Sequence, residues 1–385
     1  MNNSVEVFIM SFIAFATLFD SAFMIPIMAL YAMELGANEI LAGLILGLFS
    51  ITIIPASLLS GILVDRFGKR RILTLGLLLD AFLVFMYGYV TNYNELIIIR
   101  VLHAIGSSLT PPAFIARVRE MSGDGRLGFS LGRFLAPMSL SIALGSMSAG
   151  VLTATLGYRL SFTIASIALF VAFVLSVRLP ETVERREWRG LRGLIEAMKE
   201  KGLKLIAGLW LTFFLYIVMG LIGGGLAASL VKYGIVMEMK EARLIAGIGT
   251  GLASFVATAF YIINGLLADR RGLRFVVLFS AATSICGFTL AAATLKPITI
   301  ILGLGLFGVG IAGIFLVSTI LVTAPVRARG TAAGLQQVLM ALGIGLGAPL
   351  GGFLSVVGPT SLFMGASIAV LLAASAIKLY KLEIR

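Results

Sequence analysis

Four residues that can carry charge lie within long apolar stretches of the sequence, at Asp20, Asp80, Arg100 and His103. An ionisable side chain deep in a membrane helix costs about 2.5–3.5 kcal/mol on insertion scales, so each of them is a candidate functional group. Arg100 and His103 are three residues apart and share one helix face. Carboxyl, guanidinium and imidazole groups that approach one another can form a proton-binding site, because neighbouring charges and hydrogen bonds set the pKa of each group.

Helix geometry places these four groups at related depths. Counted from the predicted outer helix ends at 1.5 Å per residue, Asp20 and Asp80 lie roughly 16 Å deep, His103 roughly 12 Å and Arg100 roughly 8 Å. His103 also titrates near neutral pH. We therefore expect Asp20 to alternate between protonated and ionised forms, with Arg100 and His103 setting its pKa. Three simpler interpretations stay open: Arg100 can extend to the membrane surface, Asp80 can pair with or cap a neighbour, and His103 can be a satisfied packing residue.

The composition requires a membrane environment for the helices that hold these groups. Of the 385 residues, 59% are hydrophobic and only 12% are charged, and the mean hydropathy is +1.06. Soluble domains have about a quarter of their residues charged. The single cysteine, Cys286, excludes an intrachain disulfide, and one histidine excludes a multi-histidine metal site. We expect no metal and no cofactor.

Apolar stretches of about 20 residues predict spanning helices, because backbone groups in lipid must pair within their own segment. The fold class expected is an all-α membrane protein with twelve transmembrane helices, at residues 6–33, 39–64, 72–91, 95–117, 128–154, 159–178, 203–231, 243–267, 274–294, 297–324, 330–356 and 359–378. The first segment is interpreted as a retained span and not as a cleaved signal peptide.

A polar stretch at 179–202 divides the predicted spans into two groups of six. We expect an N-terminal bundle at 1–178, a cytoplasmic central loop at 179–202 and a C-terminal bundle at 203–385. Within the loop, residues 189–202 can form an amphipathic surface helix.

The distribution of Lys and Arg predicts the orientation. With both termini in the cytoplasm, the inner loops and chain ends hold 24 of the 30 Lys and Arg residues, whereas the outer loops hold five. Positive residues concentrate on the cytoplasmic side of membrane proteins. We expect a multi-pass protein of the cell (inner) membrane, and we attribute the net charge of +12 to this asymmetry and not to nucleic-acid binding.

An internal repeat relates the two halves. Gly61, Asp65 and Gly68 recur 204 residues later as Gly265, Asp269 and Gly272. A second set of glycines, at 128, 132, 145 and 150, recurs 202 residues later. Because each period contains six spans, the two halves have the same orientation, as in a parallel duplication.

The repeated phrase resembles the signature loop of the major facilitator superfamily (MFS), G-x-L-x-D-R-x-G-[RK]-[RK], of the prokaryotic twelve-span type. Its residues here are Gly61, Leu63, Asp65, Arg66, Gly68, Lys69 and Arg70. The resemblance implies two six-helix bundles around a central solute site, with both copies of the loop acting as a conformational latch. The second copy would contribute Gly265, Asp269, Arg270 and Gly272.

Two further segments bear on the subclass. The segment "RVLHAIG", from Arg100, resembles the fourth-span motif R-x-x-Q-G-x-G, with His103 in place of Gln. In proton-coupled members the Arg of this motif is implicated in proton transfer.

The fifth-span segment "ALGSMSAG" lacks the proline typical of drug–proton antiporters, whereas span eleven has "GAPLGGFL". Further cavity candidates, beside Asp20, are Tyr216, Tyr261, Gln336 and Gln337.

The sequence therefore predicts a secondary transporter that works by alternating access. We expect proton coupling and export of an amphipathic or drug-like solute by a monomer in the lipid bilayer, and no enzymatic activity. Three alternatives remain: a proton symporter or facilitator for a metabolite, a non-transporting receptor or scaffold on the same fold, and a membrane-embedded enzyme. The isolated, symmetry-related Asp65 and Asp269 argue against the enzyme.

Overall fold

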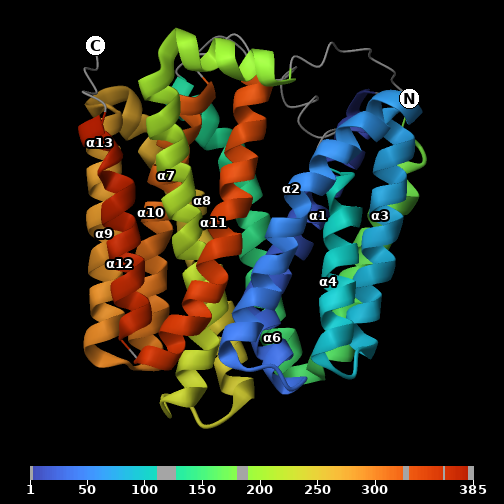
Figure 1. Ribbon diagram of the computed structural model, residues 1–385, viewed down its shortest axis with the longest axis vertical. Helices are drawn as coiled ribbons and strands as arrows, with labels where there is room; N and C mark the ends of the chain where they lie inside the picture. The colour runs from blue at the N-terminus through green and yellow to red at the C-terminus, as the bar shows by residue number, and fades with distance from the viewer. Residues whose placement is uncertain (1–2, 111–126, 180–189, 324–328, 359, 380–385) are drawn as a thin grey trace.

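The computed structural model describes residues 3–110, 127–179, 190–323, 329–358 and 360–379, and the regular structure within them is helical (Figure 1). The first half contains α1 (Asn3–Glu34), α2 (Glu39–Phe67), α3 (Lys69–Met86), the short η1 (Tyr87–Tyr89), α4 (Tyr93–Ser108) and α6 (Leu127–Ser176). The second half contains α7 (Gly190–Lys232), α8 (Met239–Arg271), α9 (Leu273–Thr294), α10 (Pro297–Thr323), α11 (Arg329–Val357), α12 (Ser361–Ala374) and α13 (Ala376–Leu379).

The helix lengths fit a protein that crosses the bilayer many times. Nine helices in the described part of the chain are long and apolar enough to span a membrane. One of them, α6, consists of two arms joined at Gly157, whose φ of 75° and ψ of 172° are not helical. The described parts of α4 and α12 are shorter. This arrangement agrees with the expected all-α fold of twelve segments.

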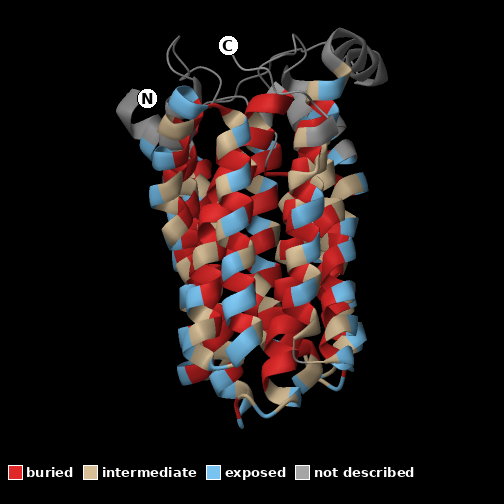
Figure 2. Ribbon diagram, turned by 90° about the vertical axis from the view of Figure 1, so that its left-hand side faces the viewer, coloured by how far each residue is buried: buried red, intermediate tan, exposed pale blue. Residues whose placement is uncertain are grey.

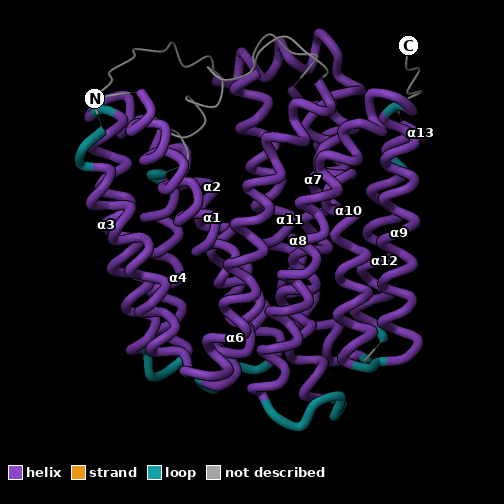
Figure 3. The backbone as a smooth tube through the Cα atoms, turned by 180° about the vertical axis from the view of Figure 1, so that it is seen from behind, coloured by secondary structure: helices purple, strands orange, loops and turns teal. Residues whose placement is uncertain are grey.

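The two ends of the bundle are distinguished by the chain direction. We call the end at which α1 begins the proximal end, and the end at which α1 finishes the distal end. The short loops of the described chain lie at these two ends in Figure 3. The expected central loop is partly helical, because α7 begins at Gly190 and includes the end of the 179–202 stretch. Side chains of residues 190–201, and with them the expected amphipathic face, lie outside the described residues.

Each half has its own apolar core. One large cluster of buried hydrophobic side chains draws on residues 207–376 together with Leu30. The other draws on residues 9–179 together with Ala348. The halves touch where Leu30 and Ala348 join the opposite cluster, and at a third cluster in which Leu135 and Ala136 of α6 pack with residues of α8 and α10.

The outward helix faces are apolar as well. Large side chains such as Ile98, Phe170, Phe255 and Met364 are all more than half exposed, and exposed positions recur along the outer faces of the helices in Figure 2. Such a surface is incompatible with water but matches lipid chains. The polar atoms gathered inside the bundle are therefore the ones that need a functional account.

The two copies of the repeated phrase adopt the same turn. Gly68, between α2 and α3, has φ 92° and ψ 150°, and Gly272, between α8 and α9, has φ 87° and ψ 163°. This region of backbone space is essentially restricted to glycine. The sequence repeat is therefore also a repeat of backbone geometry.

Close helix contacts in the second half depend on glycine. A Cβ atom added to Gly303 on α10 would meet the carbonyl oxygen of Gly287 on α9, and the reverse also holds. Such small residues let membrane helices approach closely enough for dispersion contacts to hold them together.

We expect Gly303→Ala to lower the free energy of unfolding by about 1–3 kcal/mol, since the added methyl group forces α9 and α10 apart. The matched control is Gly334→Ala, at a helical glycine of α11 where, among the described residues outside its own helix backbone, no atom lies within 4 Å of the added Cβ. Alanine favours a helix by up to about 1 kcal/mol over glycine, so the control should be neutral or stabilising. Thermal unfolding of the purified protein in detergent measures both, and equal shifts would contradict the packing argument.

Candidate functional site

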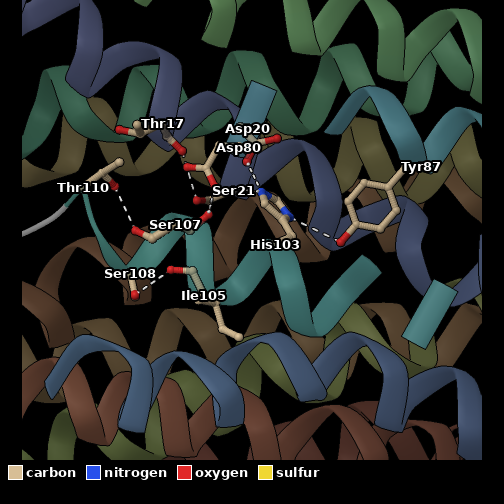
Figure 4. Close-up of polar contacts among 10 residues, drawn as sticks. All are labelled: Thr17, Asp20, Ser21, Asp80, Tyr87, His103, Ile105, Ser107, Ser108 and Thr110. Atoms are coloured by element: carbon tan, nitrogen blue, oxygen red, sulfur yellow. Dashed lines mark hydrogen bonds and ion pairs between the residues drawn. The ribbon is translucent and has the colours of Figure 1, made fainter. Parts of the chain in front are cut away.

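Three of the predicted proton-binding residues meet in the interior of the first half. The His103 Nε2 atom on α4 lies 3.3 Å from Asp20 Oδ2 on α1 and 3.8 Å from Asp80 Oδ1 on α3. All three residues are almost completely buried. Figure 4 shows the imidazole ring pointing at the two carboxyl groups, which approach it from neighbouring helices.

Helical spacing explains how α4 gathers this cluster. Ser107 follows His103 by four residues on the same face, and its hydroxyl donates to Asp80 Oδ1 at 2.9 Å. Gly106 faces the same carboxyl group, because a Cβ at this position would lie 2.9 Å from Asp80 Oδ1. The absence of a side chain there lets α3 and α4 bring Asp80 beside His103.

The second ring nitrogen of His103 has a partner that sequence reasoning missed. Tyr87 is fully buried, and its hydroxyl lies 3.3 Å from His103 Nδ1 (Figure 4). Tyr31 on α1 donates a hydrogen bond to the backbone carbonyl of Tyr87 and helps to position it. A signal was present in the sequence: Tyr87 follows Asp80 by seven residues, which is two helical turns.

Tyr87 can serve both protonation states of the imidazole. A phenol hydroxyl is both a donor and an acceptor. It can donate to Nδ1 of the neutral ring when the proton is on Nε2, and it can accept from Nδ1–H of the imidazolium. The local structure is therefore compatible with a histidine that gains and loses a proton in place.

The two carboxyl groups cannot be equally satisfied by one imidazole. A single Nε2–H has one proton to share, and among the described residues Asp20 Oδ1 has no hydrogen-bond partner. At these distances the charge on each of the three groups acts directly on the other two. The arrangement therefore places three groups that can bind a proton side by side within an otherwise apolar interior.

Arg100 lies on the same helix but makes different contacts. Its Nη2 donates to the Leu46 carbonyl oxygen on α2 at 3.3 Å, and its Cζ lies 4.7 Å from the ring centroid of Phe49. The Phe49 ring is also 5.2 Å from the His103 ring. Arg100 thus adjoins the cluster through Phe49 and through the side chain of Tyr87, and not by a direct bond to either aspartate.

The predicted cavity residues of the second half form two separate groups. Gln336 Nε2 on α11 donates to hydroxyl oxygens of Thr212, Ser318 and Thr319 at 3.1–3.2 Å. Tyr216 and Tyr261 each make an edge contact with Phe315, with ring centroids 6.1 and 6.5 Å away. Gln337 is exposed and does not belong to either group.

The predicted latch is described only in part. The surroundings of Gly61 and the side chains of Asp65 and Lys69 lie outside the described part of the chain. Arg66 is exposed beside Phe67, and Arg70 donates to the Leu179 carbonyl oxygen at 3.2 Å. In the second copy Gly265 is buried, whereas Asp269 and Arg270 are exposed at the end of α8. The role of both copies remains a prediction.

Ion pairs and aromatic contacts hold the two halves together at the distal end. Arg243 on α8 lies 3.6 Å from Glu34 on α1, donates to the Thr153 carbonyl oxygen at 2.9 Å and covers the ring of Tyr158. Lys232 on α7 pairs with Glu39 on α2 at 3.0 Å. Arg243 thereby contacts α1 and both arms of α6, all of which belong to the first half.

Glycines bring the helix backbones together behind these ion pairs. A Cβ on Gly150 would clash with Gly247, and one on Gly43 would clash with the backbone of Ala348. In Figure 1 the ribbons of α2 and α11 converge toward the distal end and separate toward the proximal end. The structure therefore represents a state in which the halves are joined distally.

Comparison with known proteins places this geometry in context. Residues 10–324 match the sequence model described as Major Facilitator Superfamily. An uncharacterized MFS-type transporter of Methanocaldococcus jannaschii is 24% identical over 360 residues, which are 91% of each chain. The quinolone resistance protein NorA of Staphylococcus aureus (strain MRSA252) is 24% identical over 189 residues, which are 49% of this chain and 48% of NorA.

Solved structures show the same fold. The nucleoside transporter NupG superposes with a TM-score of 0.72 at 16% identity and covers 100% of both chains. The human organic anion transporter MFSD10 superposes with a TM-score of 0.67 at 16% identity, over 98% of this chain and 100% of that chain.

We expect Arg243→Gln to weaken the distal closure by about 1–2 kcal/mol, because the change removes one charged partner shared by several groups. Spin labels at Leu156 and Met237, both exposed on opposite halves of the distal end, report the separation in a background with Cys286 replaced by Ser. The population at long label distances should rise by about five- to thirty-fold relative to the closed one.

Lys296→Gln is the matched control, since Lys296 is an exposed basic residue in the α9–α10 loop at the same end. The distance distribution should stay unchanged in this variant. An unchanged distribution in Arg243→Gln would show that the ion pairs do not maintain the closure.

Proposed function

The chain belongs to the major facilitator superfamily, and on that premise we propose that it is a proton-coupled secondary transporter that exports a small amphipathic solute by alternating access. Membership of this family establishes the general class of the protein, which is a membrane transporter. The coupling ion, the direction and the solute are the proposal.

The buried cluster of Asp20, His103 and Asp80 is the observation that carries proton coupling. A structural ion pair needs one carboxylate for one cation, whereas here two carboxyl groups converge on one imidazole at 3.3 and 3.8 Å. Titratable groups buried this close together are costly in a membrane protein, and such groups are concentrated at proton relays. The proton would be held between Asp20 Oδ2 and His103 Nε2, with Tyr87 stabilising the ring in either state.

Alternating access would expose this cluster to each side of the membrane in turn. The Lys and Arg asymmetry supports a cytoplasmic proximal end, which makes the state with distal ion pairs one that is closed to the outside. In this state a proton leaves Asp20 toward the cytoplasm as the solute binds. When the halves rock and the distal end opens, a proton from outside protonates Asp20 and the solute departs.

The second half supports an amphipathic solute. Tyr216, Tyr261 and Phe315 offer aromatic surface, and the Gln336 group offers an amide and several hydroxyls. Pockets that bind such compounds combine a mainly apolar lining with a few fixed polar groups. The partial similarity to NorA, which is named for quinolone resistance, favours export of a drug-like compound over metabolite uptake.

Asp20→Asn should abolish solute transport driven by a pH gradient, because the amide cannot exchange a proton. The measurement uses proteoliposomes with an imposed pH gradient, a lipophilic cation such as ethidium as the solute, and a pH-sensitive dye. We expect at least a hundred-fold loss of driven transport, with exchange of solute down its own gradient retained. Glu95→Gln, at an exposed carboxylate of the same half, is the control and should behave as wild type.

The same experiment separates the alternatives. Full pH-driven transport in Asp20→Asn would remove this residue from the mechanism. Solute entry in the direction of proton flow would indicate a symporter, and solute movement without any proton flux would indicate a facilitator. If no flux is found for any solute tested, a receptor or scaffold becomes the better assignment.

His103→Gln tests the imidazole itself. Glutamine retains hydrogen-bonding capacity but has no titratable proton near neutral pH. We expect this variant to fold normally and to lose most of the pH-driven solute transport, because the proton held between Asp20 Oδ2 and His103 Nε2 loses one of its two partners. Tyr87→Phe should lose less, since the imidazole remains and loses only one contact. Unchanged pH-driven transport in His103→Gln would assign this residue to packing.

A further inference from the structure

A pocket on the side of the first half combines basic and apolar walls. It lies where the proximal ends of α3 and the second arm of α6 meet, away from the Asp20 cluster and from the interface between the halves. Arg70, Arg71 and Thr74, from the first two turns of α3, form its polar part.

The apolar part of the pocket lies deeper in the membrane. Leu75 and Leu78 follow the arginines along α3, Phe173 comes from the last turn of α6, and Val177 follows directly after the end of α6. Leu75, Leu78 and Val177 are 47%, 39% and 54% exposed, so the pocket opens on the outer, lipid-facing surface. The lining is charged near the membrane surface and apolar deeper in the membrane. A phospholipid has the same order, with a charged headgroup at the surface and apolar acyl chains below it.

Local contacts fix the polar part in place. Arg70 Nη1 donates to the Leu179 carbonyl oxygen at 3.2 Å, beyond the end of α6. The Ser176 hydroxyl donates to Thr74 Oγ1 at 2.9 Å. These bonds join α3 to α6 and hold the floor of the pocket, while Arg71 is exposed at its edge.

From this lining we propose that the pocket binds an anionic phospholipid, with the headgroup phosphate between Arg70 and Arg71 and one acyl chain along Leu75, Leu78, Phe173 and Val177. Arginine pairs are suited to phosphate oxygens because the guanidinium presents several donors in a planar fork. Basic pockets between transmembrane helices on the cytoplasmic side recognise anionic headgroups. The proposal is independent of proton coupling and of the transported solute.

The second half provides an internal comparison. Aligning Gly272 with Gly68 places Arg274 at the position of Arg70, but Phe275 at that of Arg71 and Leu278 at that of Thr74. At these aligned positions the second half has one arginine and no hydroxyl, and the guanidinium of Arg271 covers the ring of Phe275 at 5.0 Å. The first half differs in having two consecutive arginines beside a threonine hydroxyl, which is the lining that a phosphate site requires.

The test is a lipid titration of the delipidated full-length protein in detergent, followed by native mass spectrometry. Wild type should bind the first phosphatidylglycerol molecule at least ten-fold more tightly than phosphatidylcholine. Arg71→Gln should weaken phosphatidylglycerol binding by about five-fold, the factor corresponding to about 1 kcal/mol for one basic residue near an anionic surface. Arg71→Lys should recover much of this loss, and Arg274→Gln should remain within two-fold of wild type.

Two further arms identify the ligand. Inorganic phosphate at millimolar concentration should not displace the lipid, because it cannot occupy the apolar part of the pocket. Leu78→Asn should weaken phosphatidylglycerol and phosphatidylcholine alike. Unchanged headgroup selectivity in Arg71→Gln, an equal loss in Arg274→Gln, or displacement by phosphate would each overturn the proposal. If Arg70→Gln misfolds through loss of its bond to Leu179, the Arg71 variants still decide the question.

Discussion

The scarcity of water inside the bundle is the constraint on which the rest of the structure depends. A polar atom in this interior must find its partner within the protein, because lipid offers none. Serine and threonine hydroxyls meet this requirement largely by bonding to carbonyl oxygens one turn earlier, as Thr212 does with Gly208. Other buried groups depend on partners from different helices. The amide of Gln336 reaches hydroxyls on α7 and α10, and His103 lies between carboxyl groups from α1 and α3. Of these two groups, only the one around His103 combines acidic and basic side chains, which is why we assign proton binding to it.

The sequence predicted much of the fold because lipid imposes a simple rule on it. Apolar stretches of spanning length and the Gly68/Gly272 repeat identify the helices and their duplication, and the structure confirms both the helical fold and the shared turn. The sequence also allowed a helix at 189–202 within the polar stretch, and α7 does begin at Gly190. The division into two bundles with a cytoplasmic loop between them stays a prediction. The placement of the latch side chains Asp65 and Lys69 stays a prediction.

The functional site was less accessible from the sequence. Burial inside apolar segments identified Asp20, Asp80 and His103, and depth arguments correctly placed them at similar levels. Depth alone could not give rotation about each helix axis, so it did not separate Arg100, which points to Leu46 and Phe49, from His103, which points to the carboxyl groups. Tyr87 was missed because a tyrosine near a helix end is ordinarily an interfacial anchor. Its spacing of seven residues from Asp80 was the available signal, and the contact with Nδ1 shows what that spacing means.

The glycine contacts between the halves have a consequence for the kinetics of conformational exchange. At Gly43 and Ala348, and at Gly150 and Gly247, the touching surfaces are largely backbone and small side chains. Interdigitated large side chains would have to change rotamer before two helices could part, whereas smooth surfaces separate without such steps. At these positions the seam adds no rotamer change to the barrier for rocking, and it can re-form in the same register each time the distal end closes.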